Sequence, residues 1–166
     1  MEAVSMEAVA LFGKPVVVTT RPGLLKMKTV QAAVVCCPDF KLREQLPELI
    51  HRWKGFQDFD DSKFAGGVMR LARDNSLLSE FKKDFALFYE GHGVRDLVLL
   101  SHDNCAWCTK KGLIHPCPDT NRAQYAREMI RLKYSILTMY SDLRIHCGHL
   151  RLVPDEDQIH LMPVLG

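Results

Sequence analysis

The sequence predicts an α/β fold in which helices flank a mostly parallel central sheet within a single domain. The length of 166 residues lies in the usual range of one domain, and 47% of the residues are hydrophobic. Apolar runs alternate along the chain with segments of helical periodicity, and the crossover rule then favours parallel strands. We expect an N-terminal arm over residues 1–28 and the folded domain over residues 29–166.

The first predicted elements follow this arm, in which a β-branched run over residues 16–20 leaves an edge strand or an extended segment as alternatives. Residues 30–35 form a nearly continuous apolar run, which is typical of a strand buried on both faces. Apolar residues then recur at helical spacing up to Trp53 and predict a helix that ends before Gly55. Residues 55–67 are expected to form a loop closing on two glycines, which permit positive φ or a close backbone approach.

The rest of the chain continues the alternation of helices and strands. The predicted elements are a helix from Asn75 to Gly91 or Gly93, a buried strand over residues 94–100 that leads into Ser101-His102, a long helix capped by Asp119 or Thr120, and closing strands over residues 144–153 and 159–164.

Composition limits the classes of partner. The chain has 22 Lys and Arg against 20 Asp and Glu, a formal charge of +2, so a nucleic-acid partner is not expected. No apolar run approaches the ~20 residues of a membrane helix, and the acidic N-terminus lacks the basic region and apolar core of a signal peptide. We therefore expect a cytoplasmic protein without a membrane partner. In that compartment the six cysteines are expected to be metal ligands, redox groups or core residues.

Residues of the kind that bind metals follow both buried strands. The first strand leads into Cys36-Cys37-Pro38-Asp39, and the second leads into His102-Asp103-Asn104-Cys105. Sites of open α/β sheets form at the carboxyl ends of strands, so these segments are expected to meet. Two thiolates and an imidazole suit zinc, and three protein ligands with an exchangeable fourth position are typical of catalytic zinc sites.

These segments resemble the motifs of the β-class carbonic anhydrases. That family has Cys-x-Asp-x-Arg after one buried strand and His-x-x-Cys-Gly after a later one. The matching stretches are Cys37-Pro38-Asp39-Phe40-Lys41 and His102-Asp103-Asn104-Cys105-Ala106. Between them, Phe64-Ala65-Gly66-Gly67 is similar to the family's Asn-Ala-Gly-Gly loop, and the likeness extends over residues 30–163.

The resemblance implies zinc bound by Cys37, His102 and Cys105, and reversible hydration of CO2 to bicarbonate by a zinc-bound hydroxide. The resemblance implies Asp39 as the catalytic residue, which would accept the hydrogen bond of the hydroxide and orient it. In the family this aspartate either ligates zinc or is held away by the motif arginine. Cys37 is preferred to Cys36 because only Cys37 has an aspartate two residues on. The family also implies a homodimer or a higher homo-oligomer.

Three positions depart from the family's pattern, because Lys41 replaces the arginine, Ala106 the glycine and Phe64 the asparagine. Lysine cannot grip a carboxylate with two parallel hydrogen bonds, so Lys41 and Arg43 are alternative partners of Asp39. Two alternative functions therefore stay open. One is a catalytically silent, zinc-stabilised scaffold of the same fold, and the other is a hydrolase of a related small electrophile such as carbonyl sulfide or carbon disulfide.

A third alternative is a thiol redox pair made by Cys105 and Cys108, although such pairs normally open a helix and a loop is expected over residues 109–112. Cys117 and Cys147 are assigned to packing, and His115 is a candidate proton shuttle. Asp103 and Asn104 either order the ligand loop or cap a turn. A solvated face of the long helix is expected to carry Arg122, Arg127, Glu128, Arg131 and Lys133.

Overall fold

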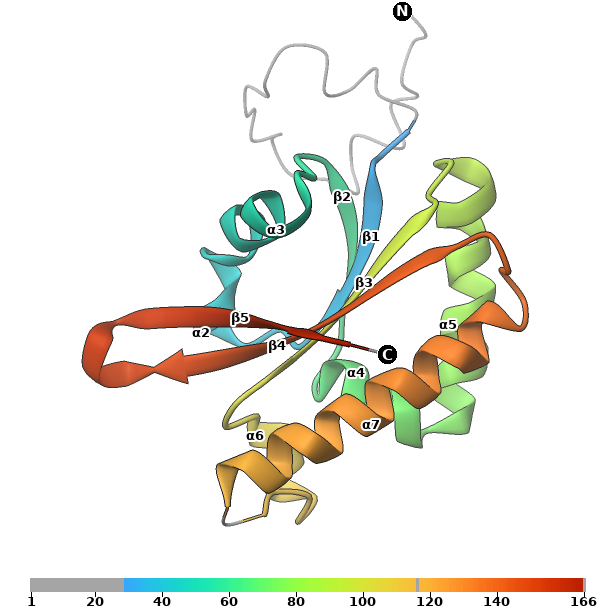
Figure 1. Cartoon of the computed structure of the whole chain (residues 1–166). Coiled ribbons are helices and arrows are strands. Elements are labelled where there is room, and N and C mark those ends of the chain that lie inside the picture. Colours follow the sequence, from blue (N-terminus) through green and yellow to red (C-terminus); the bar gives the residue numbers. More distant parts are fainter. Residues whose placement is uncertain (1–28, 116, 166) are drawn as a thin grey trace, which may run out of the picture.

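A computed structural model describes residues 29–115 and 117–165 (Figure 1). The predicted arm, with its β-branched run, lies outside these residues. The elements in chain order are β1 (Ala32–Cys36), α2 (Phe40–Arg43), α3 (Leu46–Lys54), β2 (Phe59–Lys63), α4 (Gly67–Arg73), α5 (Asn75–Ala86), the π-helical turn η2 (Leu87–Gly91), β3 (Asp96–His102), α6 (Ala106–Lys110), α7 (Pro118–Leu137), β4 (Arg144–Val153), the 3-10 turn η3 (Pro154–Glu156) and β5 (Gln158–Val164).

The strands form one five-stranded sheet in the order β2-β1-β3-β4-β5. The first four strands of this order are parallel, and β5 returns antiparallel to β4. The predicted α/β fold with a mostly parallel sheet is therefore confirmed. From β1 the chain moves to β2 on one side and later to β3 on the other, so the ends of β1 and β3 flank a switch in strand order, where open sheets place their sites.

Helices cover both faces of the sheet (Figure 1). The larger core lies between the sheet and helices α4, α5 and α7, and it includes Val35, Leu97 and Leu99. The smaller core packs Val34 and its neighbours against α2 and α3. Every residue of β1 and β3 is buried, which explains why both strands could be predicted from continuous apolar runs.

Several local predictions are wrong. The expected loop over residues 55–67 contains the edge strand β2, whose polar sequence Phe-Asp-Asp-Ser-Lys gives no strand pattern. The short helix α4 was not predicted, and the first predicted helix is divided into α2 and α3. The long helix begins at Pro118, so Asp119 and Thr120 lie in its first turn and do not cap it; proline suits the first helical position because its φ is fixed there.

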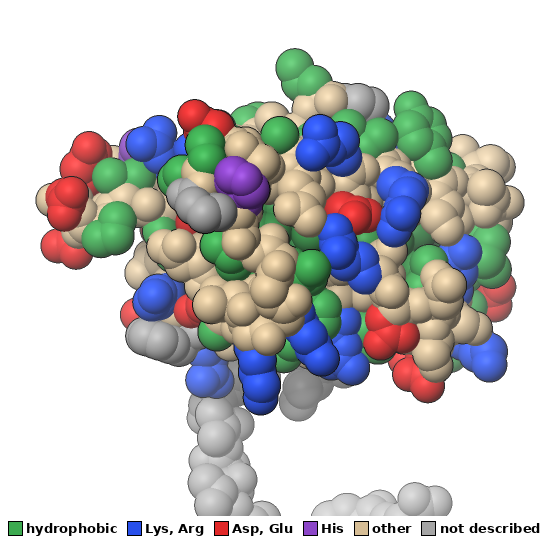
Figure 2. Space-filling model, turned by 90° about the horizontal axis from the view of Figure 1, so that it is seen from below, with side chains coloured by type: hydrophobic (Ala, Val, Ile, Leu, Met, Phe, Trp, Pro, Cys, Tyr) green, Lys and Arg blue, Asp and Glu red, His purple; other side chains and the backbone are tan. Residues whose placement is uncertain are grey.

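The molecule has a charged outer surface at the edge where β1 and β3 end. Figure 2 views this edge and shows acidic side chains gathered at one end, where the turn between β4 and β5 carries the exposed residues 155–157. Lys and Arg side chains are spread over the remainder of this view. Within residues 29–115 and 117–165, no helix combines the length and the hydropathy needed to cross a bilayer.

Candidate metal centre

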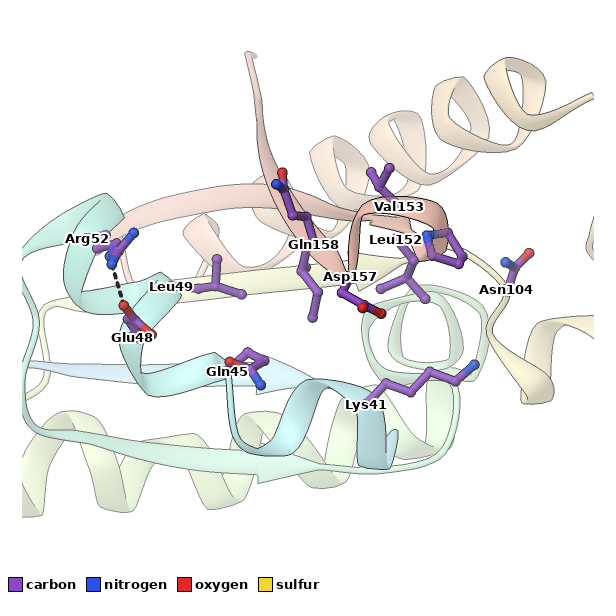
Figure 3. Close-up of a pocket in the computed structure, with 12 residues that line it drawn as sticks. Lys41, Gln45, Glu48, Leu49, Arg52, Asn104, Leu152, Val153, Asp157 and Gln158 are labelled. Carbon is purple, nitrogen blue, oxygen red and sulfur yellow. Dashed lines mark ion pairs between the residues drawn. The ribbon is translucent and has the colours of Figure 1, made fainter.

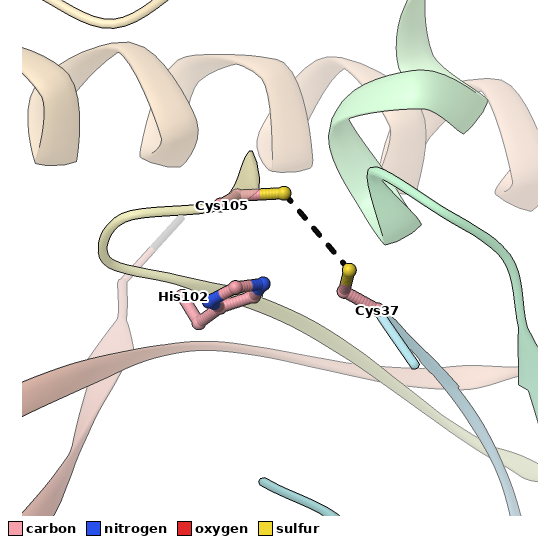
Figure 4. Close-up of side chains that lie close together, drawn as sticks. All are labelled: Cys37, His102 and Cys105. Carbon is pink, nitrogen blue, oxygen red and sulfur yellow. Dashed lines mark hydrogen bonds between the residues drawn. The ribbon is translucent and has the colours of Figure 1, made fainter. Parts of the chain in front are cut away.

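Cys37, His102 and Cys105 meet at the carboxyl edge of the sheet, between the ends of β1 and β3 (Figure 4). Their ligand atoms all lie within 4.8 Å of one another, and the sulphur atoms of Cys37 and Cys105 are 3.9 Å apart. Two Zn–S bonds of ~2.3 Å at a tetrahedral angle would place two sulphurs ~3.8 Å apart. The geometry of the two thiols therefore fits one shared zinc ion.

The imidazole of His102 is oriented so that it could coordinate a metal ion. Its Nδ1 lies 2.8 Å from the backbone carbonyl of Asp103, and because a carbonyl only accepts, Nδ1 carries the proton and Nε2 the lone pair. Nε2 is buried and has no hydrogen-bond partner within the described part of the chain. An unpaired buried acceptor costs about 1–3 kcal/mol. A metal ion would remove this cost, since the imidazole edge faces the two sulphurs (Figure 4).

Contacts among three thiols favour one thiolate, at Cys105. Hydrogen bonds from the thiols of Cys108 and Cys37 hold the pKa of Cys105 well below its ordinary value. The same contacts with Cys105, together with burial, raise the pKa values of Cys37 and Cys108. Hydrogen bonds from the backbone N–H groups of Gly66 and Asp39 act to lower the pKa of Cys37. Among these three thiols, Cys105 is therefore the one whose thiolate form the contacts favour.

Gly66 and Gly67 let the loop before α4 pack against the first ligand segment. Their φ values are +87° and +46°, in the left-handed region that favours glycine. A Cβ atom on Gly67 would lie 2.7 Å from the backbone nitrogen of Cys37, and one on Gly66 would lie 2.6 Å from the ring of Trp107. The predicted close backbone approach at this pair is confirmed, and it sets the position of the Cys37 backbone.

A buried hydrogen-bond network holds the ligand loop, residues 102–105. Nε2 of His149 donates to Oδ1 of Asp103 at 3.0 Å, and Nδ1 of His149 lies 2.9 Å from the hydroxyl of Ser101. Arg122 donates to the other oxygen of Asp103 at 3.2 Å. Although burial acts to raise it, these hydrogen bonds hold the pKa of Asp103 below its usual range. The structure thus favours the alternative in which Asp103 orders the ligand loop.

Solved structures with a similar fold include carbonic anhydrases. The enzyme from Streptococcus mutans matches with a TM-score of 0.52 at 16% identity, over 96% of this chain and 92% of that one. The enzyme from Glaciozyma antarctica gives 0.52 at 15% identity, over 96% and 92%. The β-carbonic anhydrase isoform I of Trichomonas vaginalis gives 0.51 at 15% identity, over 84% and 85%. The chain has the β-carbonic anhydrase fold.

Sequence identities of 15–16% show a shared fold and nothing more. No protein-family model matches the chain, and no curated protein matches its sequence. The β-carbonic-anhydrase-like fold expected from the motifs is nevertheless confirmed, including the single sheet with helices on both faces.

Asp39 lies outside the group formed by the three ligand atoms. Its Oδ1 accepts a hydrogen bond from the backbone amide of Lys41 at 3.0 Å, and it thereby caps α2. The side chain of Lys41 lines a pocket of about 530 Å³, and Asn104 lines the same end of this pocket (Figure 3). Arg43 lines a smaller pocket together with Cys37 and Asp39. In this β-carbonic anhydrase fold, a helix amide binds the aspartate that the family's motif pairs with arginine.

Cys108 is a neighbour of the centre that the motifs do not include. It is completely buried, and Tyr125, whose ring stacks on His149 with centroids 5.3 Å apart, borders it. The expected loop over residues 109–112 is wrong at residues 109–110, which belong to the helix α6 that begins directly after its N-cap residue Cys105; residues 111–112 form a turn. The objection that this Cys-x-x-Cys pair does not open a helix therefore fails.

The remaining predicted residues lie elsewhere. His115 is exposed, and its Nδ1 accepts a hydrogen bond from the backbone amide of Cys117. Cys36 is buried on the opposite face of the sheet, and burial raises the pKa of its thiol to about 12. Cys147 is buried in the larger core as predicted, whereas Cys117 is exposed and its assignment to packing is wrong.

The expected solvated face of α7 is wrong at two positions. Arg122 turns inward to Asp103, and its side chain is only 21% exposed. The side chain of Glu128 is 16% exposed and forms ion pairs with Arg73 and Arg131. Charge alone did not distinguish these residues, because one partner of each, Asp103 or Arg73, lies outside α7.

Proposed function

We propose that the chain binds Zn²⁺ through Cys37, His102 and Cys105 and catalyses the reversible hydration of CO2 to bicarbonate. The observation that carries the proposal is the buried group of two thiols and an imidazole, with an unpaired Nε2 on His102, in a β-carbonic anhydrase fold. Three such ligands leave a fourth position exchangeable. Zinc in this group would supply a Lewis acid that lowers the pKa of water toward ~7.

The residues around the group have separate tasks in this proposal. Cys105 offers a thiolate, and the carbonyl of Asp103 fixes the tautomer in which His102 presents its lone pair. Asp39 is held outside the group by the amide of Lys41, which leaves the fourth position to the reacting molecules. As a carboxylate, Asp39 only accepts hydrogen bonds, so it suits the orientation of a proton-bearing nucleophile.

The proposal includes the localisation, the assembly and the domain organisation of the protein. We propose a cytoplasmic homodimer or higher homo-oligomer, with residues 29–166 as the zinc domain and residues 1–28 as its arm. CO2 is small and neutral, so the near balance of charges in the chain is compatible with it.

Metal analysis and stopped-flow kinetics test the proposal. We expect one zinc per chain after gel filtration, and loss of that zinc in Cys37→Ser and His102→Ala. Cys117→Ser is the matched control, because Cys117 is exposed and outside the group. The zinc-loaded protein should hydrate CO2 faster than buffer between about pH 6.5 and 9, where a zinc site activates water. Full zinc occupancy without such a rate would leave the zinc-stabilised scaffold as the function.

The structure also favours a second candidate, a thiol redox function of Cys105 and Cys108. Cys105 caps α6, Cys108 lies in that helix, and the contact between them lowers the pKa of Cys105. In this function, a disulfide co-reactant would take two electrons and two protons from the pair, which would form a disulfide while the co-reactant becomes a dithiol. Zinc that survives gel filtration in Cys108→Ser but is lost in Cys37→Ser would count against this candidate.

A further inference from the structure

The pocket of about 530 Å³ that Lys41 lines has no task in the proposed function (Figure 3). Its volume lies within the range of about 300–1,000 Å³ that is usual for sites of small organic molecules. None of the three proposed zinc ligands lines it. The side chains around it come from α2, α3, the ligand loop and the hairpin of β4 and β5, and they include Lys41, Glu48, Leu49, Arg52, Leu152 and Asp157.

One wall of this pocket is apolar. Leu49, Leu152 and Ile159 come from α3, β4 and β5, and all three are half-buried residues that pack against the smaller core. Leu152 and Ile159 are paired in register across the two antiparallel strands, so their side chains lie next to each other on the sheet. A ligand with an aliphatic body would cover the part of this wall that the protein leaves exposed, and such burial is favourable.

Charged groups of both signs border the apolar wall. Glu48 and Arg52 form an ion pair with each other, so they add no net charge to the pocket. Lys41 and Asp157 add one cation and one anion. In Figure 3 the ion pair lies at one end of the pocket, and Lys41 points toward the other. The carboxylate of Asp157 has no ion pair within the described part of the chain. The pocket is therefore neutral as a whole, yet it offers a positive and a negative group to a ligand.

We propose that this pocket binds a small zwitterion with an aliphatic body, in the class of an apolar amino acid or dipeptide. Its carboxylate would lie at Lys41, where the side-chain amide of Asn104 can donate a further hydrogen bond, and its ammonium would lie at Asp157. A simple anion would leave Asp157 unmatched, and a simple cation would leave Lys41 unmatched. An uncharged apolar molecule would remove water from both charges without replacing it. The inference goes beyond the proposed function and does not depend on a metal.

Three related dipeptides test the site on the full-length chain. Leucyl-leucine carries both charges, N-acetyl-leucyl-leucine lacks the ammonium, and leucyl-leucine amide lacks the carboxylate. Binding of each is followed by saturation-transfer NMR at constant ionic strength. We expect saturable binding of leucyl-leucine and a Kd about tenfold higher for each of the other two, the change that 1.4 kcal/mol produces.

Two variants assign the charges of the dipeptide to residues. Lys41→Gln should raise the Kd of leucyl-leucine about tenfold but leave that of the amide unchanged, because the amide has no carboxylate for Lys41 to bind. Asp157→Asn should likewise weaken leucyl-leucine but not the N-acetylated dipeptide. Asparagine tolerates the positive φ of +50° at this position, so the variant should keep the turn.

Asp155→Asn and Lys110→Gln are the matched controls, since both residues are exposed and neither lines the pocket. Equal Kd values for the three dipeptides, or equal weakening in the controls, would overturn the inference. Unchanged binding of leucyl-leucine in Lys41→Gln and Asp157→Asn would also overturn it. A chain that hydrates CO2 but does not bind leucyl-leucine would reject this site and leave the proposed function intact.

Discussion

Asp103→Ala tests whether the buried network holds the ligand loop. The side chains of His149 and Asp103 are 4% and 13% exposed, so their 3.0 Å hydrogen bond is shielded from water. The substitution leaves the Nε2–H of His149 buried without an acceptor, which costs about 1–3 kcal/mol. The bond from Arg122 is also lost, but Arg122 keeps its ion pair with Asp119, which limits this part to about 1 kcal/mol. We expect the free energy of unfolding to fall by about 3 kcal/mol.

Two measurements follow from this value. For a domain of this size, 1 kcal/mol shifts Tm by about 2–4 °C, so calorimetry should show a decrease of about 6–12 °C. The backbone carbonyl of Asp103, which orients His102, stays in the variant, but the loop that carries it loses its side-chain anchors; displacing such an outer partner lowers metal affinity about 10–100-fold. Competition with a chromophoric chelator would measure this loss of zinc affinity.

Asp119→Asn is the matched control, because it removes the other partner of Arg122 at a side chain that is 90% exposed. We expect little change in its Tm or zinc affinity. If Asp103→Ala melts within about 2 °C of Asp119→Asn and binds zinc equally well, the network does not hold the loop and the reasoning from burial is refuted.

Three further predictions concern the backbone, the acid range and the metal. Gly67→Ala should lower Tm and zinc affinity more than Gly112→Ala does, since both have positive φ but only Gly67 lies against the backbone of Cys37; equal losses would refute the close-approach argument. Although burial acts to raise it, hydrogen bonds from Arg144 and His146 hold the pKa of Asp96 low. The stability that Asp96 contributes is therefore present above about pH 4 and is lost as the pH falls. Tm should therefore decrease less steeply with falling pH in Asp96→Asn than in the unmodified protein, and an equal decrease would contradict this. A chelator should lower the Tm of the zinc-loaded protein but not that of His102→Ala; a decrease in both would place the metal elsewhere.

The sequence predicted the parts of the molecule that depend on local patterns. β1 and β3 are buried on both faces, so their continuous apolar runs distinguish them from the rest of the chain. Because Cys37 follows one of these strands and His102 ends the other, the meeting of the ligand segments followed from a parallel sheet. The positive φ of Gly66 and Gly67 was likewise a local property.

The sequence could not predict features that depend on distant partners. Within the described residues β2 pairs only with β1, and its polar residues carry no alternation, so the sequence did not predict the place of Lys63 beside the centre. Asp103 is bound by His149, 46 residues further along the chain, and by Arg122, 19 residues further along. Nothing in the charge pattern of α7 marks Arg122 as an inward-facing residue.

The departures from the family's motif concern residues around the candidate centre, whereas the three ligand types of the motif are present. Arginine is absent at the position of Lys41, yet the amide of that residue binds Asp39, and positive charge enters the adjoining pocket from Arg43 and Lys63. A helix amide is neutral, so it can hold the carboxylate but cannot supply the charge that an arginine would. If the centre acts on an anion, that charge must come from side chains, and the pocket places two of them there. Variants of the proposed ligands remove the metal from an enzyme and from a scaffold alike, so the rate of CO2 hydration by the zinc-loaded protein is the measurement that separates the two.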